Sequence, residues 1–470
     1  RTEPCPEQHG TLTVLTHVVS GATVLLVENE DINKAFGIGF GTFPSDDTGV
    51  FHILEHSVLA GSEKYPVTSP FLQLLKSSMA SFLNAMTFPD KTVYPFATPN
   101  ETDFKNLMDV YLNAVFCPLA MVDKAVFEQE GWHRSADGTV SGVVYNEMQG
   151  ALAAPDAQLE NALERAMFPD TAYGFVSGGD PASIPALTYE KYKRVYRRHY
   201  SADNCCITLY GKMDMAEKLE LLDRDYLSKM PKGTSRPRLT VQDEQAGACV
   251  ELPYYTENPE PDEVQCALAW YTGAFADRER QLGVEVLLDA LLGTNNSPQP
   301  VLELVLRGAT RETAGRFSAA VRKAVDGILT EGIPQELLLA SLNAAEFASL
   351  ERPGSLPDGV LDAINASTGW LHTGDPARLF ASLREKMADG WFDELLRELF
   401  APAPVQVVQV PTLPGKDEEN APVRTDGKLV LEHPLTAADL GDGAKTAPGT
   451  RELLAGAQLL HHPSAGSLYL

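Results

Sequence analysis

Short strands and longer helices alternate twice along the chain, and this repeated pattern is the strongest constraint on the fold. In the first copy, three β-branched, alternating stretches lie between residues 12 and 43, and amphipathic stretches typical of helices follow them. After about Asp243 the pattern restarts, with strand-like stretches within 249–271 and a helix-like stretch at 278–292. Two such runs predict an α+β protein made of two units, each packed as layers of sheet and helix.

The chain of 470 residues is long enough for two large domains or about three of average size. A Pro- and charge-rich stretch at 255–263 predicts the first boundary, and beyond Pro411 an excess of Gly, Pro and acidic residues predicts a linker. We therefore expect three parts, at residues 1–254, 255–410 and 411–470.

The composition disfavours two classes of protein. Apolar residues make up 44% of the chain, so a sizeable core is expected. The formal net charge of −26 disfavours nucleic-acid binding and would tolerate basic substrates. No window approaches the about 20 nearly uncharged apolar residues that a membrane helix requires, so no membrane partner is expected.

The six cysteines are too few for a disulfide framework in a chain of this length. We expect buried free thiols and a reducing compartment, either the cytoplasm or, in a eukaryote, the mitochondrial matrix. Residue 1 is Arg and no basic-then-apolar signal segment follows it, which predicts a processed or cut start.

Two predicted helices carry the residues of greatest chemical interest. The first runs through Val50, Phe51 and Leu54 toward Val58, with Asp47 or Thr48 as its N-cap. The second is a long helical run from Asn146 through Phe168, loosened near Pro155.

The motif HILEH at residues 52–56 lies within the first of these helices. Positions four apart share one helical face, so His52 and His56 can direct ring nitrogens at one ion. Glu55 would then lie beside the metal, where it could act as a general base on a metal-bound water. This spacing is the inverted zincin pattern. The alternative is a surface helix whose two histidines face solvent.

A hydrolytic zinc site needs a third protein ligand, and Glu147 in GVVYNEMQGAL is the best candidate. We place it at a strand-to-helix junction. The local pattern by itself favours an ordinary first-turn Glu stabilised by the helix dipole. Further along the chain, Gly178, Gly179 and Asp180 predict a turn, because the Lys and Ser/Thr of a phosphate loop do not follow.

Five segments occur in an order that closely resembles the pitrilysin/insulinase superfamily of zinc metallopeptidases, in its presequence protease and falcilysin branch. They are TFPSDDTGVFHILEHSVLAGSEKYP, SFLNAMTFPDKTVYPFATPN, FEQEGWH, GVVYNEMQGAL and SGGDPASIPALTYEKY, and the resemblance covers roughly residues 10 to 300. It implies that His52, His56 and Glu147 bind one Zn²⁺ and that Glu55 is the catalytic base.

The resemblance also implies a substrate site. In this family an edge strand near the metal takes the substrate peptide as an added strand, a mode of binding that reads backbone more than side chains. Residues 81–88 would be that strand, with Asn84, Ala85, Met86 and Thr87 as substrate-binding residues. Asn84 looks like the family's polar residue beside the scissile bond, and the alternative is an Asn that caps a turn.

Family members enclose unfolded peptides in a chamber between two homologous halves. The resemblance thus implies that this chain is one half of a clamshell, with two homologous units that each have a mostly antiparallel sheet packed with helices. Residues 1–254 would be the catalytic domain, 255–410 a similar non-catalytic domain, and 411–470 a connector toward an absent C-terminal half or second subunit.

The predicted function is a zinc-dependent endopeptidase that degrades unstructured peptides. One alternative is a processing peptidase that cuts a precursor at one defined site. A second alternative is a half that binds zinc but turns over poorly without a partner chain, because the ligands must be held by supporting structure.

Overall fold

The computed structural model describes most of the first 413 residues and three short segments near the C-terminus. The described residues are 1–5, 8–67, 70–233, 237–240, 247–256, 258–274, 277–292, 301–351, 356–366, 376–413, 451–454, 457–462 and 466–469. Two compact units are formed, Arg1–Leu413 and Pro414–Leu470. None of the described helices is long and apolar enough to cross a bilayer.

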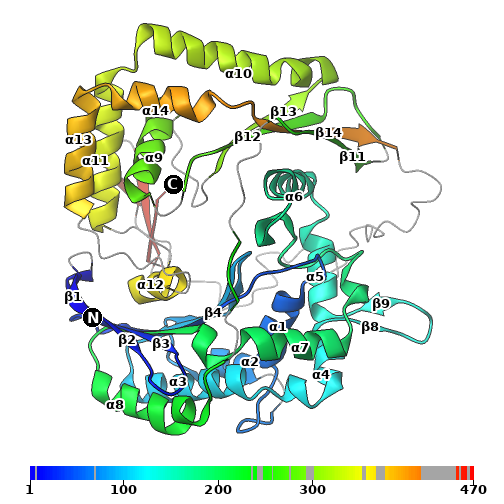
Figure 1. Ribbon diagram of the computed structural model, residues 1–470, viewed down its shortest axis with the longest axis vertical. Coiled ribbons are helices and arrows are strands. Elements are labelled where there is room, and N and C mark those ends of the chain that lie inside the picture. The colour runs from blue at the N-terminus through cyan, green and yellow to red at the C-terminus, as the bar shows by residue number, and fades with distance from the viewer. Residues whose placement is uncertain are drawn as a thin grey trace. The chain divides into compact units, whose positions relative to one another are not determined.

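The first sheet is built from the N-terminal half of the larger unit (Figure 1). Its strands are β1 (Thr2–Cys5), β2 (Gly10–Thr16), β3 (Thr23–Glu28), β4 (Lys34–Gly41), β5 (Phe82–Leu83), β6 (Met86–Thr87), β7 (Lys91–Thr98) and β10 (Cys205–Tyr210). The order is β1-β2-β3-β10-β4-β7-β5, and β6 also pairs with β7. All neighbours are antiparallel except β3 and β10, which are parallel.

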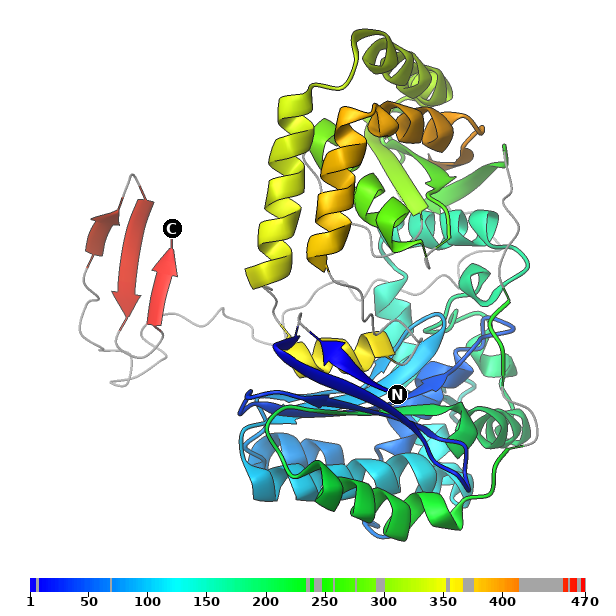
Figure 2. The same cartoon turned by 60° about the vertical axis from the view of Figure 1, so that its left-hand side comes forward.

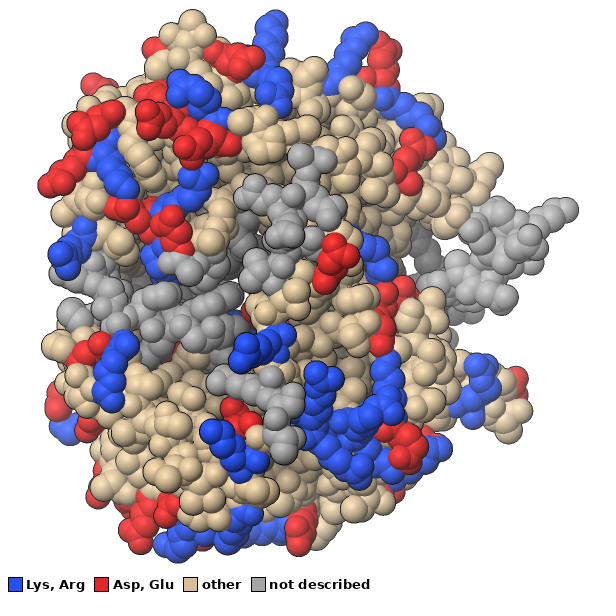
Figure 3. Space-filling view, in the orientation of Figure 1, with Lys and Arg blue, Asp and Glu red and all other residues tan. Residues whose placement is uncertain are grey.

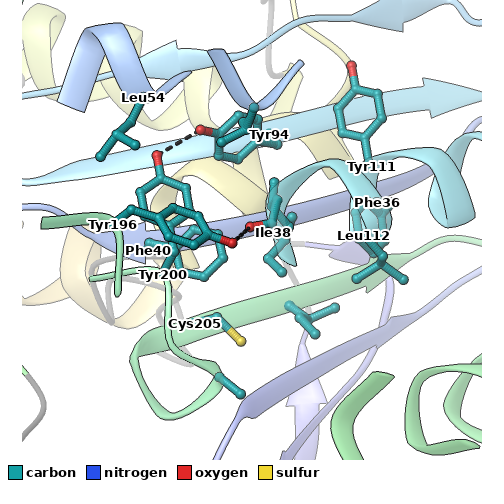
Figure 4. Close-up of a cluster of buried hydrophobic side chains, with 14 of the residues drawn as sticks. Phe36, Ile38, Phe40, Leu54, Tyr94, Tyr111, Leu112, Tyr196, Tyr200 and Cys205 are labelled. Atoms are coloured by element: carbon teal, nitrogen blue, oxygen red, sulfur yellow. Dashed lines mark hydrogen bonds between the residues drawn. The ribbon is translucent and has the colours of Figure 1, made fainter. Parts of the chain in front are cut away.

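Helices that follow β4 and β7 cover one face of this sheet. They are α1 (Val50–Val58), α2 (Pro70–Ser77), α3 (Glu101–Phe116), α4 (Lys124–Glu130), α5 (Val143–Ala151), α7 (Tyr189–His199) and α8 (Met215–Leu221), with a small hairpin of β8 (His133–Arg134) and β9 (Val140–Ser141) before α5. Helix α6 (Pro155–Met167) follows α5 but lies on the second sheet. The core between sheet and helices is rich in aromatic rings (Figure 4). Within it the buried hydroxyls of Tyr94 and Tyr200 lie 2.8 Å apart and satisfy each other.

The second sheet has four strands. They are β11 (Cys249–Tyr255), β12 (Val264–Tyr271), β13 (Val301–Ala309) and β14 (Val405–Thr412), in the order β11-β14-β12-β13. Its helices are α9 (Arg278–Leu292), α10 (Arg311–Glu331), α11 (Gln335–Glu351), α12 (Asp358–Ala366), α13 (Pro376–Ala388) and α14 (Trp391–Phe400). Only β11 and β14 are parallel among its neighbouring strands.

The two sheets share one topology. In the second sheet, β11 is the first strand along the chain and pairs in parallel with β14, the last strand. Next to β14 come β12 and then β13. In the first sheet, β3, β10, β4 and β7 repeat this order. The prediction of two similar layered units with mostly antiparallel sheets is therefore confirmed.

Within Arg1–Leu413, each of the two sheets is also covered by one helix from the part of the chain that forms the other sheet. Helix α6 packs on β11, β12 and β14, whereas α12 packs on β4, β7 and β10. Figure 2 shows α12, in yellow, on one face of the first sheet with a layer of helices on the other. The approach of α12 is so close that a Cβ atom on Gly37 would lie 2.4 Å from the Cβ of Ala363.

The strands of the second sheet do not stay within the predicted domain boundaries. Strand β11 begins at Cys249, inside the segment 1–254, yet pairs with β14 of the second sheet. Strand β14 in turn reaches Thr412, inside the predicted connector 411–470. Composition locates the polar loops of a chain. The pairing of strands and the packing of α6 and α12 depend instead on which apolar faces are buried together, which composition does not show.

The two helix predictions need one correction each. Helix α1 ends at Val58 as predicted but begins later, because its N-cap is Gly49 at φ 62°, with no side-chain cap from Asp47 or Thr48. The predicted run 146–168 is two helices, α5 and α6, because Pro155 starts a new helix and cannot continue the old one.

The smaller unit contains an antiparallel sheet of β15 (Arg451–Leu454), β16 (Ala457–His462) and β17 (Gly466–Tyr469). Residues 414–450, the larger part of the predicted connector, lie outside the described residues.

Candidate metal centre

Helix α1 holds three of the four predicted residues of the site. His52 and Glu55 are 9% and 8% exposed, so an ionisable pair is buried in the helical layer. The rings of His52 and His56 lie 4.9 Å apart between centroids, as expected for residues one turn apart on one face. The start of the helix requires glycine, since a Cβ on Gly49 would lie 2.5 Å from the carbonyl oxygen of Gly178.

The fourth residue, Glu147, comes from helix α5 and closes the site. Its Oε2 lies 3.8 Å from Nε2 of His52 and 3.6 Å from Nε2 of His56. Because α5 begins at Val143, Glu147 stands in the second turn and not at a strand-to-helix junction. Its side chain is 52% exposed, so the site opens to solvent on this side.

Both imidazole rings are held by a second contact on Nδ1. The Nδ1 of His52 lies 3.0 Å from the carbonyl oxygen of Gly178. A carbonyl can only accept, so Nδ1 carries the proton and the lone pair is on Nε2, which points toward Glu147. The Nδ1 of His56 lies 3.6 Å from Oε2 of Glu130. Such outer contacts are typical of histidines that bind metals, because they fix the tautomer and the ring orientation.

The charges around His56 are predominantly negative. Burial lowers the pKa of His56, but the adjacent carboxylate of Glu130 and the charges of Glu55 and Glu147 outweigh burial, so the pKa is raised above its usual value. Three carboxylates around one imidazole thus favour a positive charge at this point.

The donor set fits a zinc ion. One ligand atom from each of His52, His56 and Glu147 lies within 4.8 Å of the others. Donor atoms at the corners of a tetrahedron with bonds of 2.0–2.1 Å lie about 3.4 Å apart, close to the separations of Glu147 from the two rings. Two imidazoles and one carboxylate are also the ligands of a known class of hydrolytic zinc sites that keep a fourth position open.

The edge of the first sheet lies against this group. Strands β5 and β6 pair with β7, and no described strand pairs with their other side. The hydroxyl of Thr87, in β6, donates to Oε2 of Glu55 at 2.7 Å. The edge strand and the predicted base are therefore connected by a direct hydrogen bond.

Asn84 lies in the break between β5 and β6. Its backbone N–H donates to Pro95 at 3.2 Å and its carbonyl oxygen accepts from the hydroxyl of Tyr111 at 3.2 Å. Its side chain is exposed and makes no hydrogen bond within the described part of the chain, so it caps no turn there.

Two contributors to the site were not predicted from the sequence. Glu130 was within the motif FEQEGWH but had no assigned role, and Gly178 was taken only as part of a turn. A carbonyl oxygen carries no residue-type signal, so the contact of Gly178 with His52 could not be found by pattern. For Glu130, the sequence offered one indication, which is the pair of acidic residues at the end of α4.

Two family models match the chain. The family described as "Insulinase (Peptidase family M16)" matches residues 37–174, which include all four residues of the site. The family described as "Peptidase M16 inactive domain" matches residues 186–324. The chain belongs to the insulinase family. Within it, the chain lies in the presequence protease branch.

The curated relatives that the chain matches are longer than the chain. Protein HypA of Clostridium perfringens is 34% identical over 420 residues, which are 81% of this chain and 43% of that protein. Presequence protease 1, chloroplastic/mitochondrial, of Arabidopsis thaliana is 36% identical over 397 residues, or 77% of this chain and 37% of that protein. The chain therefore spans less than half the length of these insulinase-family relatives.

Solved structures share the fold at low sequence identity. A protease from Helicobacter pylori is similar with a TM-score of 0.64 and 16% identity, covering 86% of this chain and 100% of that one. The periplasmic protease PqqL from Escherichia coli is similar with a TM-score of 0.65 and 14% identity, covering 100% of this chain and 56% of that one. These likenesses support the insulinase-family fold and nothing more specific.

Proposed function

We propose that this chain is the catalytic half of a zinc-dependent endopeptidase that cleaves unstructured peptides bound as an added β-strand. The observation that carries the proposal is the convergence of Nε2 of His52, Nε2 of His56 and Oε2 of Glu147, beside a buried Glu55. Membership of the insulinase family and the names of the presequence protease relatives support peptides as the substrate class.

His52, His56 and Glu147 would hold the ion. Zinc in such a site acts as a Lewis acid that polarises the scissile carbonyl and activates water. Glu55 would take the proton of the attacking water and return it to the departing amine. The hydroxyl of Thr87 donates to Oε2 of Glu55, and Oε1 accepts no hydrogen bond within the described residues, so Oε1 can take up this proton.

The edge of the sheet would position the substrate. A peptide that adds to β5 and β6 binds through its main chain, which suits substrates of varied sequence. Because Thr87 bonds to Glu55, the same strand that holds the peptide also holds the base, and the scissile carbonyl is brought near the base. The exposed side chain of Asn84 would reach the peptide beside the scissile bond.

A further polypeptide is part of the proposal. The relatives extend well beyond the region matched here, and Glu147 stays half exposed in this chain. We infer that a C-terminal half, or a second subunit, encloses the substrate and excludes water around the ion.

The test uses Glu55→Gln, with Glu63→Gln as a control at an exposed acid on the segment after α1. Zinc content and hydrolysis of a fluorogenic unstructured peptide are measured for both variants, in the chain alone and in a polypeptide extended at its C-terminus. We expect Glu55→Gln to keep its zinc and lose about 10²–10⁴-fold in kcat/KM, while Glu63→Gln matches the parent. Full activity in Glu55→Gln, or no hydrolysis by either parent polypeptide, would contradict the proposal.

The same assay separates the two alternatives. Cuts at many unrelated positions in a mixed peptide library are expected for a degradative enzyme, whereas a single defined cut in one precursor would favour a processing peptidase. Zinc bound without turnover in the chain alone, with turnover restored by the extension, would identify a half that depends on its partner.

A further inference from the structure

The outward face of helix α7 carries an unusual concentration of positive charge. In the 11 residues of this helix, YEKYKRVYRRH, five are Lys or Arg and one is Glu. The chain as a whole has a net charge of −26. Figure 3 shows Lys and Arg side chains gathered over α7, in the lower right part of the view. We call Arg194, Arg197 and Arg198, which lie three and four positions apart, the α7 arginine face.

The arginines of this face form no ion pair with acids of the described residues, although the charge of Arg197 acts on Glu190 two turns earlier in the same helix. Lys191 pairs with Asp46, and Lys193 pairs with Glu190 at 2.8 Å, so these two lysines are neutralised. The three arginines of the α7 face are all exposed, and within the described residues none of them has a hydrogen bond or ion pair. They are therefore free to bind a ligand from solution.

Helix stability does not account for this arrangement. The helix dipole favours cations in the last turn, which explains part of the benefit of Arg197 and Arg198. Arg194 stands one turn earlier, where the dipole effect has decayed. Like charges at spacings of three and four destabilise a helix, so a third arginine on this face costs stability.

The opposite face of α7 is anchored. Tyr192, Tyr196 and His199 are buried, the hydroxyl of Tyr196 donates to the carbonyl oxygen of Val115 at 2.9 Å, and the ring of His199 packs on Phe51 of α1 at 4.8 Å between centroids. The backbone beneath the α7 arginine face is thus rigid. Binding a ligand there would cost side-chain ordering but no ordering of the helix.

We propose that the α7 arginine face is a docking site for an acidic polypeptide segment that carries two or three closely spaced carboxylates. Arginine is suited to this because its planar fork binds carboxylates with two parallel hydrogen bonds. Arg194 and Arg198 are about 6 Å apart along the helix axis, close to the spacing of alternate side chains on an extended strand. The proposal does not depend on peptidase activity.

The size of the face favours a narrow partner. Asp46 and Glu190 lie at its edges, where they pair with the two lysines of α7. Asp123 and Arg197 both act electrostatically on Tyr189, so a third acid lies near the face. A bilayer or a nucleic-acid duplex is wide enough to bring its phosphates against these acids and the strongly negative remainder of the chain. An extended peptide contacts the three arginines alone.

The experiment measures the fluorescence anisotropy of a labelled Glu-rich peptide as the full chain is added. The chain carries Glu55→Gln so that the probe is not cut, and a peptide with Gln in place of Glu is the neutral control. The test variant is Arg194→Gln with Arg197→Gln and Arg198→Gln. We expect its Kd for the acidic peptide to rise about tenfold, the loss expected for three exposed charge pairs together.

The control variant removes three charges from another exposed helix, by Arg316→Gln, Arg322→Gln and Lys323→Gln in α10. Its Kd should change less than about twofold, since long-range charge is screened by salt. A version with Lys at the three α7 positions guards against misfolding and should bind with intermediate affinity. Equal Kd values for the two triple variants would overturn the proposal, as would binding confined to anionic vesicles or to duplex DNA.

Discussion

Replacing Glu130 by Gln tests the proposed metal centre without altering a ligand or the base. The variant keeps the shape of the side chain and its contact with Gln129, whose Nε2 donates to Oε1 of Glu130 at 2.9 Å. It removes the negative charge that faces Nδ1 of His56. Loss of such an outer contact lowers metal affinity about 10–100-fold in known sites.

The geometry places the expected effect at the lower end of that range. The separation of 3.6 Å between Oε2 of Glu130 and Nδ1 of His56 is longer than a full hydrogen bond, so the loss is mainly that of a nearby charge. We expect the Kd for zinc to rise about tenfold, or ~1.4 kcal/mol. The measurement is competition with a chromophoric chelator, and kcat of the zinc-saturated enzyme should change less than the Kd.

Glu128→Gln is the matched control for this measurement. It removes the same charge from the same helix, where Glu128 pairs with the exposed Lys124 and faces away from the site. Its Kd for zinc should match that of the parent. If the two variants bind zinc equally well, Glu130 does not support His56 and the reasoning from the Nδ1 contacts is wrong.

Two further predictions concern stability. Gly37→Ala should lower the free energy of unfolding by about 1–3 kcal/mol, because the new Cβ would overlap that of Ala363, and Ala363→Gly in the same chain should recover part of the loss. Urea unfolding of the two single variants and the double variant checks this, and simple additivity would contradict it. Burial lowers the pKa of His199 below its usual value, so the unfolded chain binds a proton more readily and stability should fall as pH drops below about 6.5. Replacement by Gln should reduce that loss in urea unfolding at pH values above and below 6.5, and an equal loss in both proteins would refute it.

Much of the fold was predictable because it depends on local patterns. Alternating apolar residues predicted strands between residues 12 and 43, where β3 and β4 lie, and the helix predicted toward Val58 is α1. The sequence marked Pro155 as an irregular point, but one continuous helix was expected where the structure has two, α5 and α6. The exchange of α6 and α12 was not predictable, since an amphipathic face shows that a helix is buried but not which sheet covers it.

The sequence by itself determined that His52 and His56 share a face with Glu55 beside them, because the spacing of a single helix imposes it. Only the tertiary structure decided that Glu147, Glu130, Thr87 and the carbonyl of Gly178 meet them. These groups come from segments 32 to 126 residues away from their partners. Their meeting depends on how α5, α4 and the sheet edge pack around α1, which is set by buried area and shape rather than by spacing along the chain.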